Sequence, residues 1–211
     1  MLTDQPKTPK GSPRGPVQAR SLKRVEAACA AAEKLLVELG PDKTSIPEIA
    51  LLAKVPRATI YQYFPDKNAL FAHLATAQFQ YITDHIDTAL AQAGAVNWQD
   101  LMSVAVNAAA SFYNAHKITA ILLLRGPFGD ADRAAHTEKD KGLAERFRAR
   151  LGLRQTTSTS APDRVALAIQ IAFACFRYGY IREGVISPAI RTEAIRAVTA
   201  YIEPFMVSGS A

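Results

Sequence analysis

Residues 44–67 decide the fold, and they read TSIPEIALLAKVPRATIYQYFPDK. The pattern predicts two short helices joined by a tight turn. The first opens with a capping box at Ser45 and Glu48, whose side chains satisfy amides that a helix start leaves unpaired. The turn falls at 54–56, and the second helix is predicted over 57–63. Such a pair is typical of a helix-turn-helix motif.

The outer face of the second helix carries its polar side chains. Packing requires Ile60 and Phe64, which leaves outside Arg57, Ala58, Thr59, Tyr61, Gln62 and Tyr63. Tyrosine hydroxyls can donate to phosphate oxygens, arginine can reach a guanine edge or a phosphate, and threonine can touch a thymine methyl group. Each residue alone is compatible with an ordinary solvated side chain, but the set indicates a DNA-reading helix.

Helix signals flank this stretch on both sides. Apolar residues at three- and four-residue steps predict a first helix over 20–39, which Gly40 and Pro41 end. Asp66 is predicted to cap a long helix over 67–93.

The remainder of the chain also has the pattern of helices and lacks the alternation of strands. Helices are predicted at 98–115, 118–125, 131–151, 162–183 and 188–206, with a loop at 155–160. The expected fold class is therefore all-α, with an N-terminal three-helix helix-turn-helix domain and a C-terminal helical domain.

Positive charge is concentrated at the start of the chain. The 211 residues have a formal net charge of +6, and residues 1–24 hold six lysines and arginines against one aspartate. Residues 25–67 hold five basic against six acidic side chains, so the reading segment itself is not basic. Residues 1–19, rich in proline, lysine, glycine and serine, are predicted to be a disordered basic arm. It either follows a DNA minor groove or remains a solvated tail.

Several classes of function lack their sequence signatures. No CxxC pair, HExxH helix, glycine-rich phosphate loop or GxSxG elbow is present, so no catalytic residue, metal site or cofactor is predicted. Cys29 and Cys175 are expected to be buried, reduced thiols. Without a signal-peptide core or a bilayer-length apolar run, a cytoplasmic protein without membrane contact is expected. An all-helical enzyme is the weakest alternative.

The string TIYQYFPDKNAL at 59–70 fits the pattern T-[LIV]-Y-x-[YH]-F-x-x-K-x-x-L throughout. With residues 22–24 and 45–50, it makes the segment from about 20 to 75 resemble the DNA-binding domain of TetR-family transcriptional repressors. Two positions depart from that family. Lys54 stands where it usually has glycine, and Pro56 where it has serine or threonine. Because lysine in a left-handed turn costs about 1 kcal/mol, a strained or reshaped turn is expected, which bears on the placement of the next residue, Arg57.

The resemblance implies a homodimer whose reading helices enter successive major grooves of a pseudo-palindromic operator. By position it implies DNA contacts from Ser45, Arg57, Ala58, Thr59, Tyr61, Gln62, Tyr63 and Lys67. The basic residues at the start of the first helix are added to this set, namely Arg20, Lys23 and Arg24. Phosphate contacts are expected from Tyr61, Tyr63 and Lys67, the last beside the free amides of its helix. Sequence preference is expected from Arg57, Ala58, Thr59 and Gln62.

The resemblance further implies that the C-terminal helices bind a small effector. The predicted division is a basic arm at 1–19, a DNA-binding domain at 20–66 and a ligand-binding and dimerisation domain at 67–211. Because a pocket needs apolar walls and a few polar groups, its candidate residues are Trp98, Phe112, Tyr113, His116, Arg125, Phe128, Phe147, Phe173, Phe176, Arg177 and Tyr180. The alternative is an ordinary stripe of core residues for the four that share one helix face, namely Phe173, Phe176, Arg177 and Tyr180.

The last two long helices are expected to form the dimer interface as a four-helix bundle, with Gly179 permitting close approach. Their apolar stripes are Ala166, Ile169, Gln170, Phe173 and Ala174 on one helix, and Ala194, Ile195, Val198, Tyr201, Ile202 and Phe205 on the other. Packing within one chain is the alternative for the final helix.

The leading hypothesis is a repressor that a small, largely apolar effector releases from DNA. A constitutive DNA-binding protein without an effector is the alternative. An internal cavity of several hundred Å³ would favour effector control, and a filled interior would favour the constitutive protein.

Overall fold

The computed structural model describes residues 16–94, 97–125, 141–150 and 162–207, and all regular elements among them are helices. The elements are α1 (Pro16–Leu39), α2 (Ile46–Ala53), α3 (Arg57–Tyr61), α4 (Lys67–Ala93), α5 (Trp98–Ala115), α6 (Lys117–Leu124), a helix at 141–150, α8 (Arg164–Glu183) and α9 (Pro188–Val207). The all-α prediction is confirmed. The predicted loop at 155–160 and the part of the predicted helix at 131–140 lie outside the described residues.

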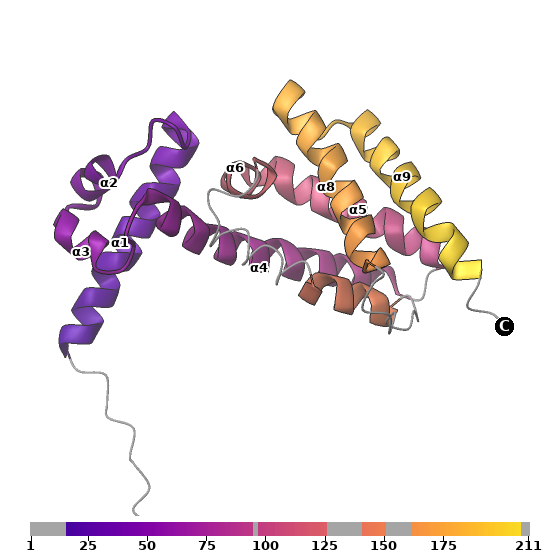
Figure 1. Cartoon of the computed structure of the whole chain (residues 1–211), viewed down its shortest axis with the longest axis horizontal. Helices are drawn as coiled ribbons and strands as arrows, with labels where there is room; N and C mark the ends of the chain where they lie inside the picture. Colours follow the sequence, from indigo (N-terminus) through magenta and orange to yellow (C-terminus); the bar gives the residue numbers. More distant parts are fainter. Residues whose placement is uncertain (1–15, 95–96, 126–140, 151–161, 208–211) are drawn as a thin grey trace, which may run out of the picture.

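Helices α1, α2 and α3 form the N-terminal unit, seen at the left of Figure 1. Its core residues are Ala28, Ala32, Leu36, Ile49, Val55, Ile60 and Phe64, all of them buried. Helix α1 ends where Gly40 adopts a φ of 80°, and the Gly40 amide donates to the carbonyl of Leu36 at 3.1 Å. The left-handed conformation suits glycine because it has no Cβ atom to clash.

Two boundaries in this unit differ from the prediction. Helix α1 begins at Pro16 rather than near Arg20, and residues 1–15 of the predicted arm lie outside the described residues. Proline fits a first helical turn because its fixed φ is already helical. Helix α3 ends at Tyr61, because the next amides close a tighter turn in which Tyr63 donates to the Ile60 carbonyl at 3.0 Å.

Helix α4 runs from the N-terminal unit into the C-terminal helices (Figure 1). Asp66 caps its start as predicted, and its carboxylate accepts the Ala69 amide at 2.8 Å. Gly94, with a φ of 70°, ends it. The N-terminal unit is therefore joined to the rest of the molecule by one uninterrupted helix.

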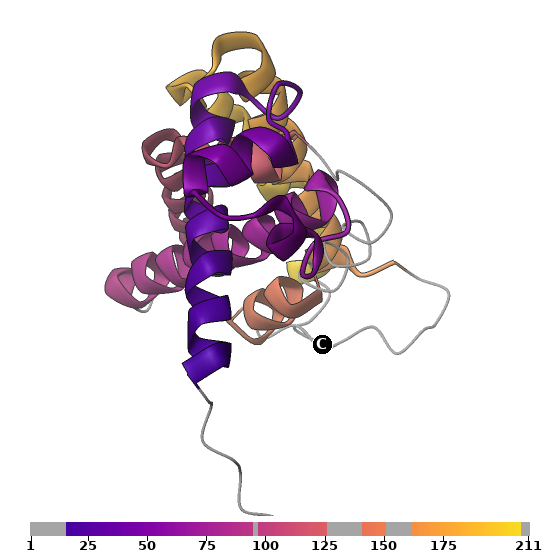
Figure 2. The same cartoon turned by 90° about the vertical axis from the view of Figure 1, so that its left-hand side faces the viewer.

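Helices α5, α6, α8, α9 and the helix at 141–150 make up the C-terminal domain. Figure 2 shows α1 upright in front of these helices. Helices α8 and α9 pack against each other, and Gly179 permits their approach because a Cβ atom there would lie 2.9 Å from Ile190 Cγ1. The Asn114 side chain of α5 holds the α8–α9 connection, since it donates to the Ile186 carbonyl at 2.9 Å and accepts the Ile186 amide at 2.8 Å.

The stripes predicted for the dimer interface contribute largely to this intrachain packing. On α9, the residues Ala194, Val198 and Ile202 are buried within the chain, which confirms the alternative for these positions. On α8, Ile169 and Phe173 border an interior cavity of the chain. The apolar side chains that α8 exposes lie on a different face.

Candidate DNA-reading surface and interior cavity

The α2–α3 motif is held by its cap and by its turn. The Glu48 carboxylate accepts the backbone amide of Ser45 at 2.9 Å and the Ser45 hydroxyl at 2.8 Å, as expected for the capping box. Lys54 has φ 55° and ψ 40°, and it is the sole non-glycine residue with a positive φ in the described part of the chain. The turn therefore keeps the left-handed geometry and tolerates the strain of a lysine.

After Lys54 the chain enters α3 through Pro56, which stands at the cap position where a residue with a capping side chain is usual. Pro56 has φ −56° and ψ 136°, and its carbonyl accepts the Thr59 amide at 2.9 Å. Arg57 is thus the first residue of α3, with an exposed side chain. Neither Lys54 nor Pro56 therefore disturbs the start of α3.

Helix α3 and the turn that follows it present the residues expected to read DNA. Arg57, Ala58, Tyr61, Gln62 and Tyr63 are exposed, and Thr59 is half-buried. Tyr61 and Tyr63 are 50% and 48% exposed, which is high for large aromatic side chains. The Tyr63 hydroxyl lies 2.6 Å from the Ser21 hydroxyl of α1, so α1 fixes the orientation of this ring.

Lys67 and Ser45 already have partners within the chain. The Lys67 ammonium group donates to the Pro41 carbonyl at 3.1 Å, and Ser45 is bonded to Glu48. An ammonium group has three donors, so Lys67 retains two for another acceptor. The predicted phosphate-binding site at the start of α4 is partly occupied, because the Asp66 carboxylate accepts the hydrogen bond of the Ala69 amide there.

The basic residues Arg20, Lys23 and Arg24 lie exposed on α1. Their spacing places them on one side of the helix. The first turns of α1 project beyond α3 in Figure 1. These three side chains therefore extend the polar surface of α3 along a second element.

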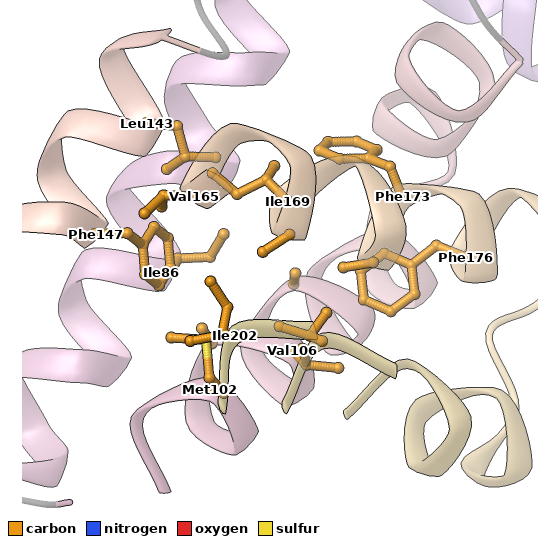
Figure 3. Close-up of a pocket in the computed structure, with 15 residues that line it drawn as sticks. Ile86, Met102, Val106, Leu143, Phe147, Val165, Ile169, Phe173, Phe176 and Ile202 are labelled. Carbon is orange, nitrogen blue, oxygen red and sulfur yellow. The ribbon is translucent and has the colours of Figure 1, made fainter. Parts of the chain in front are cut away.

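An interior cavity of about 70 Å³ lies between α4, α5, α8, α9 and the helix at 141–150 (Figure 3). Its lining is entirely aliphatic, aromatic or thioether: Ile86, Met102, Ala105, Val106, Ala109, Leu143, Phe147, Val165, Ala168, Ile169, Ala172, Phe173, Phe176, Val198 and Ile202. No lining side chain carries a nitrogen or oxygen atom.

Three of the predicted pocket residues line this cavity, namely Phe147, Phe173 and Phe176. The predicted residues that do not line it are Trp98, Phe112, Tyr113, His116, Arg125, Arg177 and Tyr180. Phe128 lies outside the described residues. Arg177 is exposed, so the predicted stripe between 173 and 180 does not place its cation in the cavity.

The predicted pocket residues that do not line the cavity lie in other environments. Phe112 and His116 border a separate surface groove of about 510 Å³, in which their rings stack with centroids 4.0 Å apart. Arg125 forms an exposed pair with Asp42 at 3.8 Å. The Tyr113 ring contacts Phe173 and Phe176 at the edge of the cavity wall. Burial raises the pKa of Tyr180, and Arg125 opposes that effect.

Ionic contacts fasten the helix at 141–150, which supplies one wall of the cavity. Arg146 binds Asp87 of α4 at 2.7 Å, and Arg150 approaches the same carboxylate at 3.6 Å. The buried Arg148 pairs with Asp163, the cap of α8. Partial burial acts to raise the pKa of Asp163, but hydrogen bonds from Arg148 and the Ala166 amide outweigh it and lower the pKa below its usual value.

The two cysteines are free and half-buried, less enclosed than predicted. Burial, with smaller contributions from Glu33 and Glu26, raises the pKa of Cys29 to about 11. The thiol is therefore protonated at neutral pH and a poor nucleophile. Within the described ranges, no group of three potential metal ligands occurs, and no helix has the length and apolar character needed to cross a bilayer.

Comparison with known proteins gives a family match over the N-terminal unit. Residues 29–74 match the family described as bacterial regulatory proteins, tetR family. No curated protein matches the sequence.

Solved structures extend the likeness over most of the chain. A TetR-family transcriptional regulator from Streptomyces coelicolor is 22% identical with a TM-score of 0.66, covering 86% of this chain and 98% of that one. The multidrug binding protein EbrR complexed with imidazole is 16% identical with a TM-score of 0.64, covering 90% and 96%. RolR in complex with resorcinol is 18% identical with a TM-score of 0.62, covering 85% and 87%. At these identities the structures show a common fold. Residues 29–74 thus match the tetR family of bacterial regulatory proteins, and the chain as a whole shares the fold of solved TetR-family regulators.

Proposed function

We propose that the chain is a transcriptional repressor that binds a pseudo-palindromic operator as a homodimer in the cytoplasm. The observation that carries the proposal is the exposed face of α3, which a buried core and the Tyr63–Ser21 contact hold in a fixed orientation. In this proposal residues 20–66 read DNA, and residues 67–211 bind the effector and dimerise.

The contacts divide between base edges and phosphates. Base edges meet Arg57, Ala58, Thr59 and Gln62, while phosphates meet Ser45, Tyr61, Tyr63, Lys67, Arg20, Lys23 and Arg24. Base contacts specify sequence, whereas phosphate contacts set register and affinity. The basic residues of α1 contribute the net positive charge that residues 25–67 lack, and each phosphate contact strengthens the dependence of affinity on salt.

In this proposal the dimer forms where the last two helices of each subunit pair. An exposed apolar face of α8 supports this arrangement. Leu167, Tyr178 and Ile181 are 38%, 56% and 68% exposed, and Ala174 lies between them on the same face. On α9, Tyr201 and Phe205 are half-buried and their rings contact each other edge to face. A face of large apolar side chains is characteristic of an interface.

The effector is a small molecule that occupies the interior cavity and releases the repressor from DNA. The fold relatives EbrR and RolR hold imidazole and resorcinol respectively. The cavity of this chain offers no hydrogen-bonding side chain, so its ligand is an uncharged apolar molecule. A ligand of ordinary size requires the walls to move apart, because about 70 Å³ is below the volume of most ligand sites.

The small volume of the cavity also favours a second candidate, a constitutive DNA-binding protein. Thermal unfolding with toluene, resorcinol or imidazole separates the two. Effector control predicts that toluene raises Tm, whereas the more polar molecules leave it unchanged. An unchanged Tm with toluene and other small hydrocarbons selects the constitutive protein.

Selection of bound duplexes from a random DNA pool tests the DNA-reading function. We expect enrichment of a palindrome whose half-sites lie about one helical turn apart or slightly more. Arg57→Ala is expected to relax the preferred sequence, and Tyr63→Ala to weaken binding to all duplexes alike. Tyr81→Ala is the matched control, because Tyr81 is an exposed tyrosine of α4. Absence of any enriched sequence for the purified chain would overturn the proposal.

A further inference from the structure

Two buried polar side chains lie where α1, α4 and α6 meet. Gln78 of α4 is 6% exposed and Thr119 of α6 is fully buried. Buried side chains of this kind are costly unless they find partners, so their partners are informative. Neither residue lines the interior cavity.

The two residues form a chain of hydrogen bonds that ends on α1. The Thr119 hydroxyl donates to Gln78 Oε1 at 2.6 Å, and Gln78 Nε2 donates to Glu33 Oε1 at 3.2 Å. The Glu33 carboxylate can only accept, so it selects the donating Nε2 end of Gln78. The Thr119 hydroxyl then holds the accepting Oε1 end of the same amide against α6.

In the part of the chain that the structure describes, a second polar link from the end of α6 to the N-terminal unit is weaker. Arg125 and Asp42 are 3.8 Å apart, and their side chains are 48% and 96% exposed. Exposed pairs of this kind contribute little because solvent screens them. The buried Thr119–Gln78–Glu33 chain is the directional polar connection between the two parts.

We propose that Gln78 and Thr119 are positioning residues that set the angle between the N-terminal unit and α6. The inference rests on the proposed function only for its consequence, namely that DNA reading requires this angle. Helix α4 also connects the chain of hydrogen bonds to the cavity. Ile86 lines the cavity and Gln78 lies two turns away on the buried side of the same helix, about 12 Å along its axis.

A shift of α4 would carry Gln78 with it, since Gln78 belongs to that helix. The hydrogen bond from Thr119 limits such a shift because Thr119 belongs to another helix. The positioning residues thus oppose a change of the angle between the N-terminal unit and α6.

Thr119→Val tests the hydroxyl because valine keeps the shape of threonine. Thr83→Val is the matched control, since Thr83 is also buried but donates only within α4, to the Phe79 carbonyl at 2.8 Å. Thr119→Ser retains the hydroxyl and is expected to behave as the parent chain. Glu33→Ala breaks the other end at a half-exposed site and serves if Thr119→Val fails to fold.

The angle is measured as an intrachain distance by pulsed electron paramagnetic resonance. Spin labels are placed at Leu51→Cys on α2 and Asn107→Cys on α5, both exposed positions, in a full-length chain that carries Cys29→Ala and Cys175→Ala. The labelled chain is mixed with an excess of unlabelled chain, so that each dimer holds at most one labelled subunit. We expect Thr119→Val and Glu33→Ala to broaden or shift the distance distribution. Thr119→Ser and Thr83→Val should leave it unchanged. Equal distributions in all variants, or equal changes in the Thr83 control, would overturn the inference.

Operator affinity then separates this inference from the proposed function. On a duplex selected by the parent chain, Thr119→Val is expected to bind about fivefold more weakly than Thr83→Val, the factor that corresponds to one typical buried hydrogen bond. A parent chain that selects no duplex refutes the proposed function, while the distance measurement still decides the role of Thr119 and Gln78.

Discussion

Gly179→Ala and Gly142→Ala are expected to change stability in opposite directions. Both glycines are helical, so alanine improves the intrinsic helix preference by up to about 1 kcal/mol at either site. At Gly142 a Cβ atom meets nothing within 4 Å, and the gain remains. At Gly179 it lies 2.9 Å from Ile190 Cγ1 and 3.2 Å from Cγ2, distances that force α8 and α9 apart.

The magnitude at Gly179 follows from these contacts. Overpacking a core costs about 1–3 kcal/mol, so Gly179→Ala is expected to destabilise by about 1 kcal/mol after the helix gain is subtracted. Urea denaturation of each variant measures the difference. Ile190→Ala in the Gly179→Ala background should remove the clash and show a favourable coupling in a double-mutant cycle. If Gly179→Ala is as stable as Gly142→Ala, the close approach of α8 and α9 is refuted.

Three other substitutions test the turn, an ionic contact and the cavity. Lys54→Gly should stabilise by about 0.5 kcal/mol in urea denaturation, because relief of a left-handed lysine outweighs the added freedom of the unfolded chain; a loss of stability would contradict this. Because the folded pKa of Asp163 is lowered, its stabilising contribution is present above the unfolded value near 3.8 and is lost as pH falls through the folded pKa. Asp163→Asn should therefore flatten the acid limb of stability against pH, and an unaltered limb would refute the role of this pair. Ala109→Val should fill part of the 70 Å³ cavity and stabilise by at most about 1 kcal/mol, while abolishing any rise in Tm with toluene; a toluene response that survives would place the ligand elsewhere.

Local rules predicted the N-terminal unit well. The cap at Ser45 and the break at Gly40 depend on backbone geometry within a few residues, which the sequence displays directly. The start of α1 was set four residues late, because a basic, proline-containing segment has the composition of a disordered arm. Composition did not show that Pro16 can open a helix that continues into the apolar face of α1.

The cavity could not be located in the same way. Its lining includes Ile86, Met102 and Val106, and such residues are indistinguishable in sequence from the filled core around them. The prediction instead selected aromatic and charged residues, among them Arg177, which is exposed. Whether a stripe such as that of Val198 and Ile202 faces a partner or its own chain depends on tertiary packing, which periodicity does not contain.

The pairing of Asn114 with Ile186 has a consequence for the length of the α8–α9 connection. The side-chain amide imitates a peptide group and forms what amounts to one rung of a β-ladder inside a helical protein. A rung of this kind has a register. Inserting one residue before Ile186 would present a different amide and carbonyl to Asn114, and it would draw the 1% exposed Ile186 side chain out of its site. This connection is therefore expected to keep its length, unlike a loop held only at its ends.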